Sequence, residues 1–243
     1  MYQHIVVIGS SYQLGERIAW HFADLQIGQA ILSELSEKTK DLLGRPDYSI
    51  HKLSTDSKSW HSVVEKDSFF ADMRVYEDLD LFLKVLYDDK KISALDIAKT
   101  VLSFQPMTNL KLQKMIYLVY ADYLTKTKKK LFQEPIVAFT YGPAVREVYD
   151  YYKNHGREEI RGDGQVVKLD EITIPVALAK IMQSDDVRKI LTSIKETLAR
   201  FGYERPAKLV NLTHIDGGPW SRTPVGQIIS DELILEYHHI ETN

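Results

Sequence analysis

Residues 107–156 read MTNLKLQKMIYLVYADYLTKTKKKLFQEPIVAFTYGPAVREVYDYYKNHG and decide how the C-terminal part of the chain folds. Thr108 begins this segment with a hydroxyl that can accept a hydrogen bond from the free backbone N–H groups of a first helical turn. The apolar side chains after it recur at helical spacing: Leu110, Met115, Tyr117, Leu118, Ala121 and Leu124. The pattern predicts a helix that begins at Thr108 and runs into a lysine-rich turn.

Lysines occur both on this helix and after it. Lys111 and Lys114 lie three residues apart on one helical side. An exposed charged face is the simpler interpretation, and a buried ion pair or a partner contact is the alternative. The cluster after the helix comprises Lys126, Lys128, Lys129 and Lys130. Such a cluster can contact phosphate or an acidic protein, but we favour a solvated loop.

The second half of the segment predicts a strand followed by a helix. Residues 136–141 (IVAFTY) are β-prone, Gly142 frees the backbone, and Pro143 suits the first position of a helix. We expect Gly156 to end that helix. Its buried side is expected to carry Val145, Val148, Tyr149 and Tyr152.

Further helices are expected on both sides of this segment. Ser93 and Asp96 have the spacing of a capping box, at the start of a helix that Pro106 stops. Residues 160–173 indicate a loop or a small hairpin. The remaining helices are expected at residues 175–182, 185–201, 208–214 and 231–238, with Gly202 ending the second.

The N-terminal part predicts a small α/β region. Residues 4–9 (HIVVIG) indicate a buried strand, followed by a turn and a helix at residues 13–22. A strand, a glycine turn and a helix are the order of a phosphate-binding loop. However, GSSYQLG at residues 9–15 lacks both the GxGxxG and the GxxxxGK[ST] spacing, so we favour an ordinary turn.

A domain boundary is expected after this region. Residues 27–43 predict an amphipathic helix and residues 48–53 a strand, followed by a polar loop at 54–59 and broken helices at 60–86. The charged run at 87–91 is expected to connect an N-terminal region (1–91) to a helical domain (92–243). The expected fold class is α+β, predominantly α-helical, with a small β element in the second domain.

Composition excludes several classes of protein. The chain of 243 residues has no cysteine, which excludes disulfides, thiolate zinc sites and a cysteine nucleophile. Its formal net charge of −3 argues against a generally basic nucleic-acid coat. His4, His21, His51 and His61 have no metal-ligand spacing, so we expect hydrogen-bonded or exposed histidines and no metal or cofactor. No leader or membrane span is evident, and we expect a cytoplasmic protein.

Three pieces of sequence together resemble the Panacea domain, also described as the SocA-like or phage-associated antitoxin domain. The first is TNLKLQKMIY at residues 108–117, where the family favours T-x-L-K-L-Q-K-L-L-Y. The second comprises Leu131-Phe132, AFTYGP at 138–143, Val145 and Tyr149. The third comprises Leu209, Leu212-Thr213-His214 and Pro219-Trp220. Phe139 stands where Trp is common and Ala144 where Val is common; the resemblance covers about residues 92–238.

The resemblance implies a mostly helical domain and a non-enzymatic antitoxin that neutralises a cognate toxin through direct protein contact. Several family toxins block translation, and some members are adaptors that deliver the toxin to a protease. No membrane partner is expected, nucleic acid is disfavoured, and no oligomeric state is assigned. Residues 1–91 lie outside the resemblance and are a natural place for the choice of toxin.

The family motif residues are structural or partner-binding. They are Thr108, Leu110, Lys111, Leu112, Lys114, Tyr117, Phe132, Tyr141, Gly142, Pro143, Tyr149, Thr213, His214, Pro219 and Trp220. We favour a buried cluster of Tyr117, Tyr141, Thr213, His214 and Trp220 with Lys111 or Lys114, because buried Tyr and Trp need partners for their polar atoms.

Two other classes of function are weaker alternatives. An enzyme would use the segment after Gly9 for a nucleotide, or His214 and Asp216 as an acid–base or metal pair. A DNA-binding repressor would need a helix-turn-helix, of which the sequence gives no clear sign.

Overall fold

The computed structural model describes residues 1–11, 14–162, 166–169 and 172–242. It divides into two compact units, Met1–Lys91 (unit 1) and Ile92–Asn243 (unit 2). Helices are the main elements and the sheets are small, so the predicted α+β, predominantly helical fold class is confirmed.

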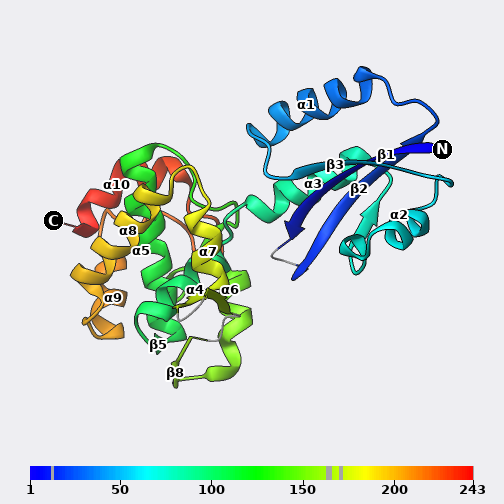
Figure 1. Ribbon diagram of the computed structural model, residues 1–243. Coiled ribbons are helices and arrows are strands. Elements are labelled where there is room, and N and C mark those ends of the chain that lie inside the picture. The colour runs from blue at the N-terminus through cyan, green and yellow to red at the C-terminus, as the bar shows by residue number, and fades with distance from the viewer. Residues whose placement is uncertain (12–13, 163–165, 170–171, 243) are drawn as a thin grey trace. The chain divides into compact units, whose positions relative to one another are not determined.

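Unit 1 is built around a four-stranded sheet with the strand order β3-β1-β2-β4 (Figure 1). The strands are β1 (Tyr2–Ser11), β2 (Glu16–Asp24), β3 (Ser49–Thr55) and β4 (Arg74–Tyr76). β1 lies antiparallel to both β2 and β3, so that Val7 pairs with Trp20 on one side and with Ile50 on the other. β4 is parallel to β2. The short, continuous apolar run of β1 is thus the centre of the sheet.

Helices cover both faces of this sheet. α1 (Gln29–Leu43) and α3 (Leu79–Lys90) pack on the face that carries Ile5, Val7, Ile18 and Trp20. α2 (Trp60–Lys66) and the 3₁₀ helix η1 (Ser68–Phe70) cover the face that carries Val6, Ile8 and Ala19. Because both faces of β1 are buried, its central residues 5–8 (IVVI) are all apolar and do not alternate with polar residues.

Three predictions for unit 1 are wrong. Residues 16–22 belong to strand β2 and not to a helix, because Ile18 and Trp20 alternate with Ala19 between two buried faces. The first strand does not end at Gly9, which lies within β1, where an added Cβ would be 2.6 Å from Leu86. Residues 87–90 continue α3 and do not form a connector. The prediction of a turn at GSSYQLG includes residues 12–13, which lie outside the described residues.

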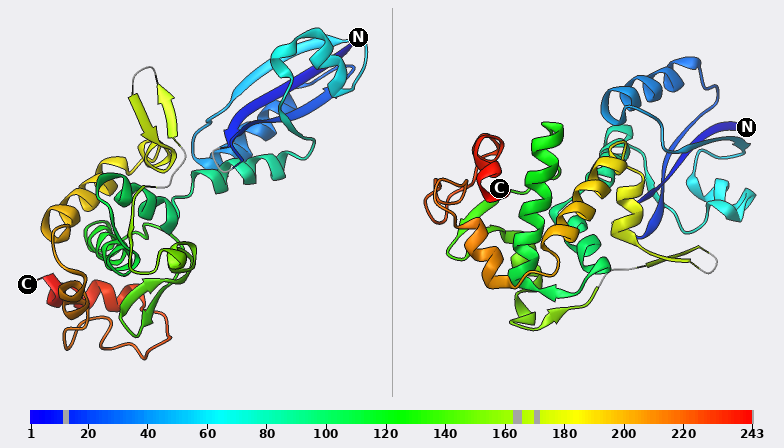
Figure 2. Two further views of the ribbon diagram at one scale, coloured as in Figure 1. Left: turned by 90° about the horizontal axis from the view of Figure 1, so that it is seen from below. Right: turned by 90° about the vertical axis from the view of Figure 1, so that its left-hand side faces the viewer.

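Unit 2 is organised around α5 (Asn109–Thr127), which Figures 1 and 2 show running between the other helices. Its contacts include α4 (Ala94–Phe104), β7 (Gly142–Val145), α8 (Val187–Phe201), α9 (Pro206–Thr213) and α10 (Asp231–Thr242). Side chains on all sides of α5 are buried, as expected of a helix at the centre of a domain. Both predicted N-terminal caps are confirmed: Ser93 forms a capping box with Asp96, and Thr108 accepts from the Lys111 N–H.

The remaining elements of unit 2 are short. They are β5 (Met107–Thr108), β6 (Ile136–Phe139), α6 (Arg146–Tyr152), η2 (Lys153–His155), β8 (Glu159–Ile160), β9 (Val166–Leu169), β10 (Ile172–Pro175) and α7 (Val176–Met182). β9 and β10 pair as an antiparallel hairpin, one of the two predictions for that region. The prediction that Gly142-Pro143 starts a helix is wrong: both residues lie in β7, which pairs with β6, and α6 begins at Arg146.

Candidate functional site

Three segments of unit 2 meet where the β6–β7 hairpin crosses α5. Lys114 of α5 donates from Nζ to the Pro143 carbonyl oxygen at 2.9 Å. Thr213, the last residue of α9, is fully buried and donates from Oγ1 to the Leu209 carbonyl at 3.0 Å. We call the group that meets here the hairpin cluster; it consists of Lys114, Gly142, Pro143, Thr213, His214 and Trp220.

Gly142 allows this close approach. Its φ of +99° is a backbone conformation that other residues rarely adopt. A Cβ at this position would be 2.8 Å from Thr213 Oγ1 and 2.9 Å from Lys114 Cε. Two independent constraints therefore favour glycine at this position of the YGP motif: the positive φ of the backbone and the lack of space for a side chain.

The aromatic members of the cluster stack on each other. The rings of His214 and Trp220 have centroids 3.7 Å apart and planes inclined by 18°. Trp220 Nε1 donates to the Phe139 carbonyl oxygen at 2.9 Å, which joins the loop after α9 to β6. Burial lowers the pKa of His214, and the charge of Lys114 lowers it further, so the ring is neutral near pH 7. Among the described residues, no hydrogen bond joins His214 to Asp216, which is exposed.

Lys111 and Lys114 are buried, so the prediction of an exposed charged face is wrong. Neither has a carboxylate within ion-pair distance among the described residues; each donates instead to a backbone carbonyl. Lys111 Nζ donates to the Gly202 carbonyl at 2.5 Å, at the C-terminal end of α8, where the helix dipole favours a cation. Burial lowers the pKa of both lysines, and that of Lys114 to about 7.

Tyr117 lies apart from the hairpin cluster. Its hydroxyl donates to Glu241 Oε2 at 2.7 Å, and the same oxygen lies 2.7 Å from His238 Nδ1. Tyr141, by contrast, is 67% exposed. The structure therefore brings together Thr213, His214 and Trp220 with Lys114, and it places Tyr117, Tyr141 and Lys111 elsewhere.

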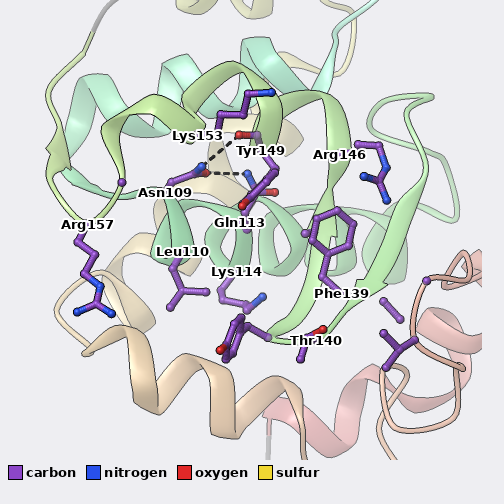
Figure 3. Close-up of a pocket in the computed structure, with 16 residues that line it drawn as sticks. Asn109, Leu110, Gln113, Lys114, Phe139, Thr140, Arg146, Tyr149, Lys153 and Arg157 are labelled. Atoms are coloured by element: carbon purple, nitrogen blue, oxygen red, sulfur yellow. Dashed lines mark hydrogen bonds between the residues drawn. The ribbon is translucent and has the colours of Figure 1, made fainter.

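The other motif residues fall into two groups. Thr108 caps α5, while Leu112, Phe132 and Pro219 are buried. Leu110 is 38% exposed and Tyr149 is 41% exposed, so the predictions that placed both on the buried sides of their helices are wrong. Leu110, Tyr141 and Tyr149 instead line a groove of about 650 Å³ beside the hairpin (Figure 3). Its other lining residues are Asn109, Gln113, Lys114, Ala138, Phe139, Thr140, Ala144, Arg146, Lys153, Gly156, Arg157, Val225 and Gly226.

A chain of hydrogen bonds fixes the frame of this groove. The Val145 backbone N–H donates to Gln113 Oε1 at 2.9 Å, Gln113 Nε2 donates to Asn109 Oδ1 at 3.1 Å, and Asn109 Nδ2 donates to the Tyr149 carbonyl at 3.2 Å. Two of these bonds are drawn in Figure 3. The two amides of α5 thus connect the helix to β7 and to α6, and the walls are positioned before any partner arrives.

One wall of the groove is a stack of a cation and two aromatic rings. The Arg146 guanidinium lies 4.9 Å from the centre of the Phe139 ring, and Phe139 meets Tyr149 edge-on with centroids 5.6 Å apart. The sequence predictions missed Arg146, Lys153 and Arg157. Their spacing from Tyr149 (146, 149, 153, 157) is that of one helical face, and this was the signal that could have indicated a common surface.

Residues 112–221, which contain the hairpin cluster and most of the groove lining, match the family model described as "Antitoxin SocA-like, Panacea domain". This part of unit 2 is therefore similar to the SocA-like Panacea domain. The match begins inside α5 and ends just after Trp220, so it includes most of α5, the β6–β7 hairpin and α9. It is shorter than the region 92–238 over which the sequence resembles the family.

A curated relative supports the same assignment. Over 130 residues, the chain is 26% identical to a protein named Antitoxin SocA from Caulobacter vibrioides (strain NA1000 / CB15N). The alignment covers 54% of this chain and 62% of that relative. No solved structure matches the chain. None of the helices in the described ranges has both the length and the apolar character required to cross a bilayer.

Unit 1 contains a buried pair of histidines. His4 Nδ1 lies 2.9 Å from His21 Nε2, and His4 Nε2 lies 2.8 Å from Thr55 Oγ1. The predicted hydrogen-bonded histidines are therefore confirmed for His4 and His21. Burial lowers the pKa of both, that of His21 to about 4, with His4 adding a smaller effect. In the part of the chain that the structure describes, no group of three His, Asp or Glu side chains is arranged to hold a metal ion.

Proposed function

We propose that this protein is a non-enzymatic antitoxin that neutralises a cognate toxin protein by binding to it directly. The Panacea domain and the name of the C. vibrioides relative support an antitoxin role. One structural observation carries the proposal of direct binding. Three family motif residues, Leu110, Tyr141 and Tyr149, are exposed at a single groove, where packing of the core does not require them. Exposed aromatic side chains that lie together are typical of protein interfaces.

The binding surface extends beyond the groove in this proposal. A stable protein complex usually buries about 1,200–2,000 Å² in total, which is more than a groove of this size offers. We propose that unit 1 contributes further contacts and the choice of toxin. Its strand β3 is an edge of the sheet with Ile50 and Lys52 exposed, and an edge strand can pair with a strand of another protein.

The toxin's action is proposed from the family resemblance alone. We propose that the toxin blocks translation, which pulse labelling of new protein in cells that express the toxin would measure. Delivery of the toxin to a protease is the alternative. The two mechanisms differ in toxin level: neutralisation by binding leaves the toxin intact in the complex, whereas delivery removes it.

Co-expression with the product of the neighbouring open reading frame tests the proposed function. We expect that product to arrest growth, and this chain to restore growth and to co-purify with it. Replacing Tyr141 and Tyr149 together by Ser should weaken both effects. Tyr203→Ser is the matched control, because Tyr203 is 92% exposed and does not line the groove. A neighbour that is neither toxic nor bound contradicts the proposal.

A further inference from the structure

The groove has an unusual charge for this protein. Its sixteen lining residues include four cations, Lys114, Arg146, Lys153 and Arg157, and no aspartate or glutamate. The whole chain, in contrast, carries more acidic than basic residues and a net charge of −3. A concave site lined by one sign of charge concentrates ligands of the opposite sign. The occupant with complementary charge is therefore acidic.

Three of the four groove cations have no ion-pair partner among the described residues. In the described ranges, Lys126, Lys129 and Lys130 after α5 each form an ion pair with a carboxylate. Of the groove cations, only Lys153 has such a partner there, Asp150 at 3.5 Å. The two arginines and Lys114 therefore keep their capacity for a charged ligand.

Lys114 places a buried amine at the floor of the groove. Its side chain is 1% exposed, and its Nζ has one acceptor, the Pro143 carbonyl, for three potential donors. Figure 3 shows it projecting from α5 together with Leu110. Desolvation is the cause of its lowered pKa, and a carboxylate beside Nζ would raise that pKa again. A ligand carboxylate at this place would thus bind together with a proton.

The aromatic wall adds a surface for an apolar side chain. The Arg146 guanidinium lies over the Phe139 ring, 4.9 Å from its centre, and a guanidinium can also bind a carboxylate through two of its N–H groups. Ala138, Ala144 and Val225 contribute apolar atoms to the same lining. A segment that alternates acidic and aromatic or aliphatic side chains matches both features.

We propose that the groove binds an acidic peptide segment of the toxin, with one carboxylate beside Lys114, others beside Arg146 and Arg157 at opposite ends of the groove, and an apolar side chain against Phe139 and Tyr149 (Figure 3). The proposal rests on the proposed function, since it names the part of the partner that the same site recognises. A nucleic-acid strand is less suitable, because such strands require a track of cations along many phosphates, whereas here four cations alternate with apolar and aromatic side chains.

Peptide binding to the full chain tests this inference without the toxin. The probe is a fluorescein-labelled octapeptide of alternating glutamate and phenylalanine, and the comparison peptide has glutamine for every glutamate. We expect the glutamine peptide to bind at least about tenfold more weakly. We expect a similar loss of acidic-peptide binding for Arg146→Gln and Arg157→Gln, but no change for Arg188→Gln, whose exposed arginine lies outside the groove lining.

A proton measurement tests the role of Lys114. Calorimetry of the acidic peptide near pH 8, in buffers with different ionisation enthalpies, should show proton uptake by the wild type and none by Lys114→Met.

Equal binding of the two peptides, stronger competition by an octamer of oligoadenylate RNA, or unchanged binding by the arginine variants would overturn the proposal. If the neighbouring product is toxic and the Arg146→Gln/Arg157→Gln double variant neutralises it fully, the groove proposal fails while the proposed function stands. If the peptide binds but no neighbouring product is toxic, the proposed function fails, while the preference of the groove for acidic peptides stands.

Discussion

Trp220 lies flat on His214, with ring centroids 3.7 Å apart, and its indole N–H donates to the carbonyl of Phe139 in β6. One side chain thus connects the end of α9 to the hairpin that forms the groove. The indole also covers the neutral imidazole of His214, whose Nε2 is buried without a hydrogen-bond partner among the described residues.

Trp220→Leu should lower the free energy of unfolding by about 2–4 kcal/mol, because it removes both the stacked ring and the hydrogen bond. Hydrogen exchange of residues 136–145 should accelerate more than that of α4. Tyr203→Leu is the control, since its 92% exposed ring should cost less than about 0.5 kcal/mol. Equal effects of the two substitutions would contradict the joining role of Trp220.

Gly142→Ala should destabilise the protein more than Gly226→Ala. Both glycines have positive φ, +99° and +87°, so each substitution carries a backbone cost of about 1–2 kcal/mol. Only at Gly142 does the new Cβ also meet neighbours, whereas no heavy atom lies within 4 Å at Gly226. The difference between the two losses, measured by denaturant unfolding, isolates the contribution of close packing. If the two losses were equal, the contact with Thr213 would contribute nothing.

The stability of unit 2 should rise with pH above neutrality because of Lys114. Its pKa is about 7 in the folded protein against an ordinary 10.5, so the unfolded chain binds more protons between these values. Unfolding free energy should therefore increase with pH in this window, by at most about 1.4 kcal/mol per pH unit from this group. Lys114→Met should remove that slope between about pH 7 and 9, while Lys153→Met, at the exposed rim, should keep it. The prediction fails if wild type and Lys114→Met have the same slope.

Unit 1 should lose stability in mild acid. The pKa of His21 is about 4 in the folded protein against an ordinary 6.5, so its contribution is complete above pH 6.5 and is lost as the pH falls towards 4. Fluorescence of Trp60, whose ring lies 5.3 Å from His21, would follow this change. His21→Phe should flatten the profile, and His61→Gln should not, because the His61 side chain is 80% exposed. An unchanged profile in His21→Phe would assign the acid sensitivity to other groups.

Sequence patterns correctly predicted the elements whose ends are set by residues close in the sequence. Ser93, Thr108 and Gly202 were recognised because caps and glycine stops act within a few residues. β2 was misassigned because Ile18, Ala19 and Trp20 are all buried, so a strand between two covered faces lacks alternation with polar residues. β7 was misassigned because Gly-Pro is equally a signal for a helix start, and only pairing with β6 distinguishes the two.

The candidate site was only partly predictable for a different reason. The burial of Lys111 and Lys114 depends on carbonyl groups at Gly202 and Pro143, which lie far away in the sequence. Leu110 was expected in the core because it fits the helical spacing of the apolar residues, and no local feature shows which side of α5 faces a groove. The regular spacing of Arg146, Tyr149, Lys153 and Arg157 is present in the sequence. That these side chains line a groove follows only from the position of the β6–β7 hairpin beside them.

The bond between Tyr117 and Glu241 joins residues 124 positions apart. During synthesis, α5 must wait for α10 before its buried tyrosine hydroxyl has an acceptor. At about 5–20 residues per second, this delay is roughly 6–25 s. Until then, α5 of the nascent chain lacks its contact with α10. The order of helices along the chain therefore delays the central packing of unit 2 until α10 has been synthesised.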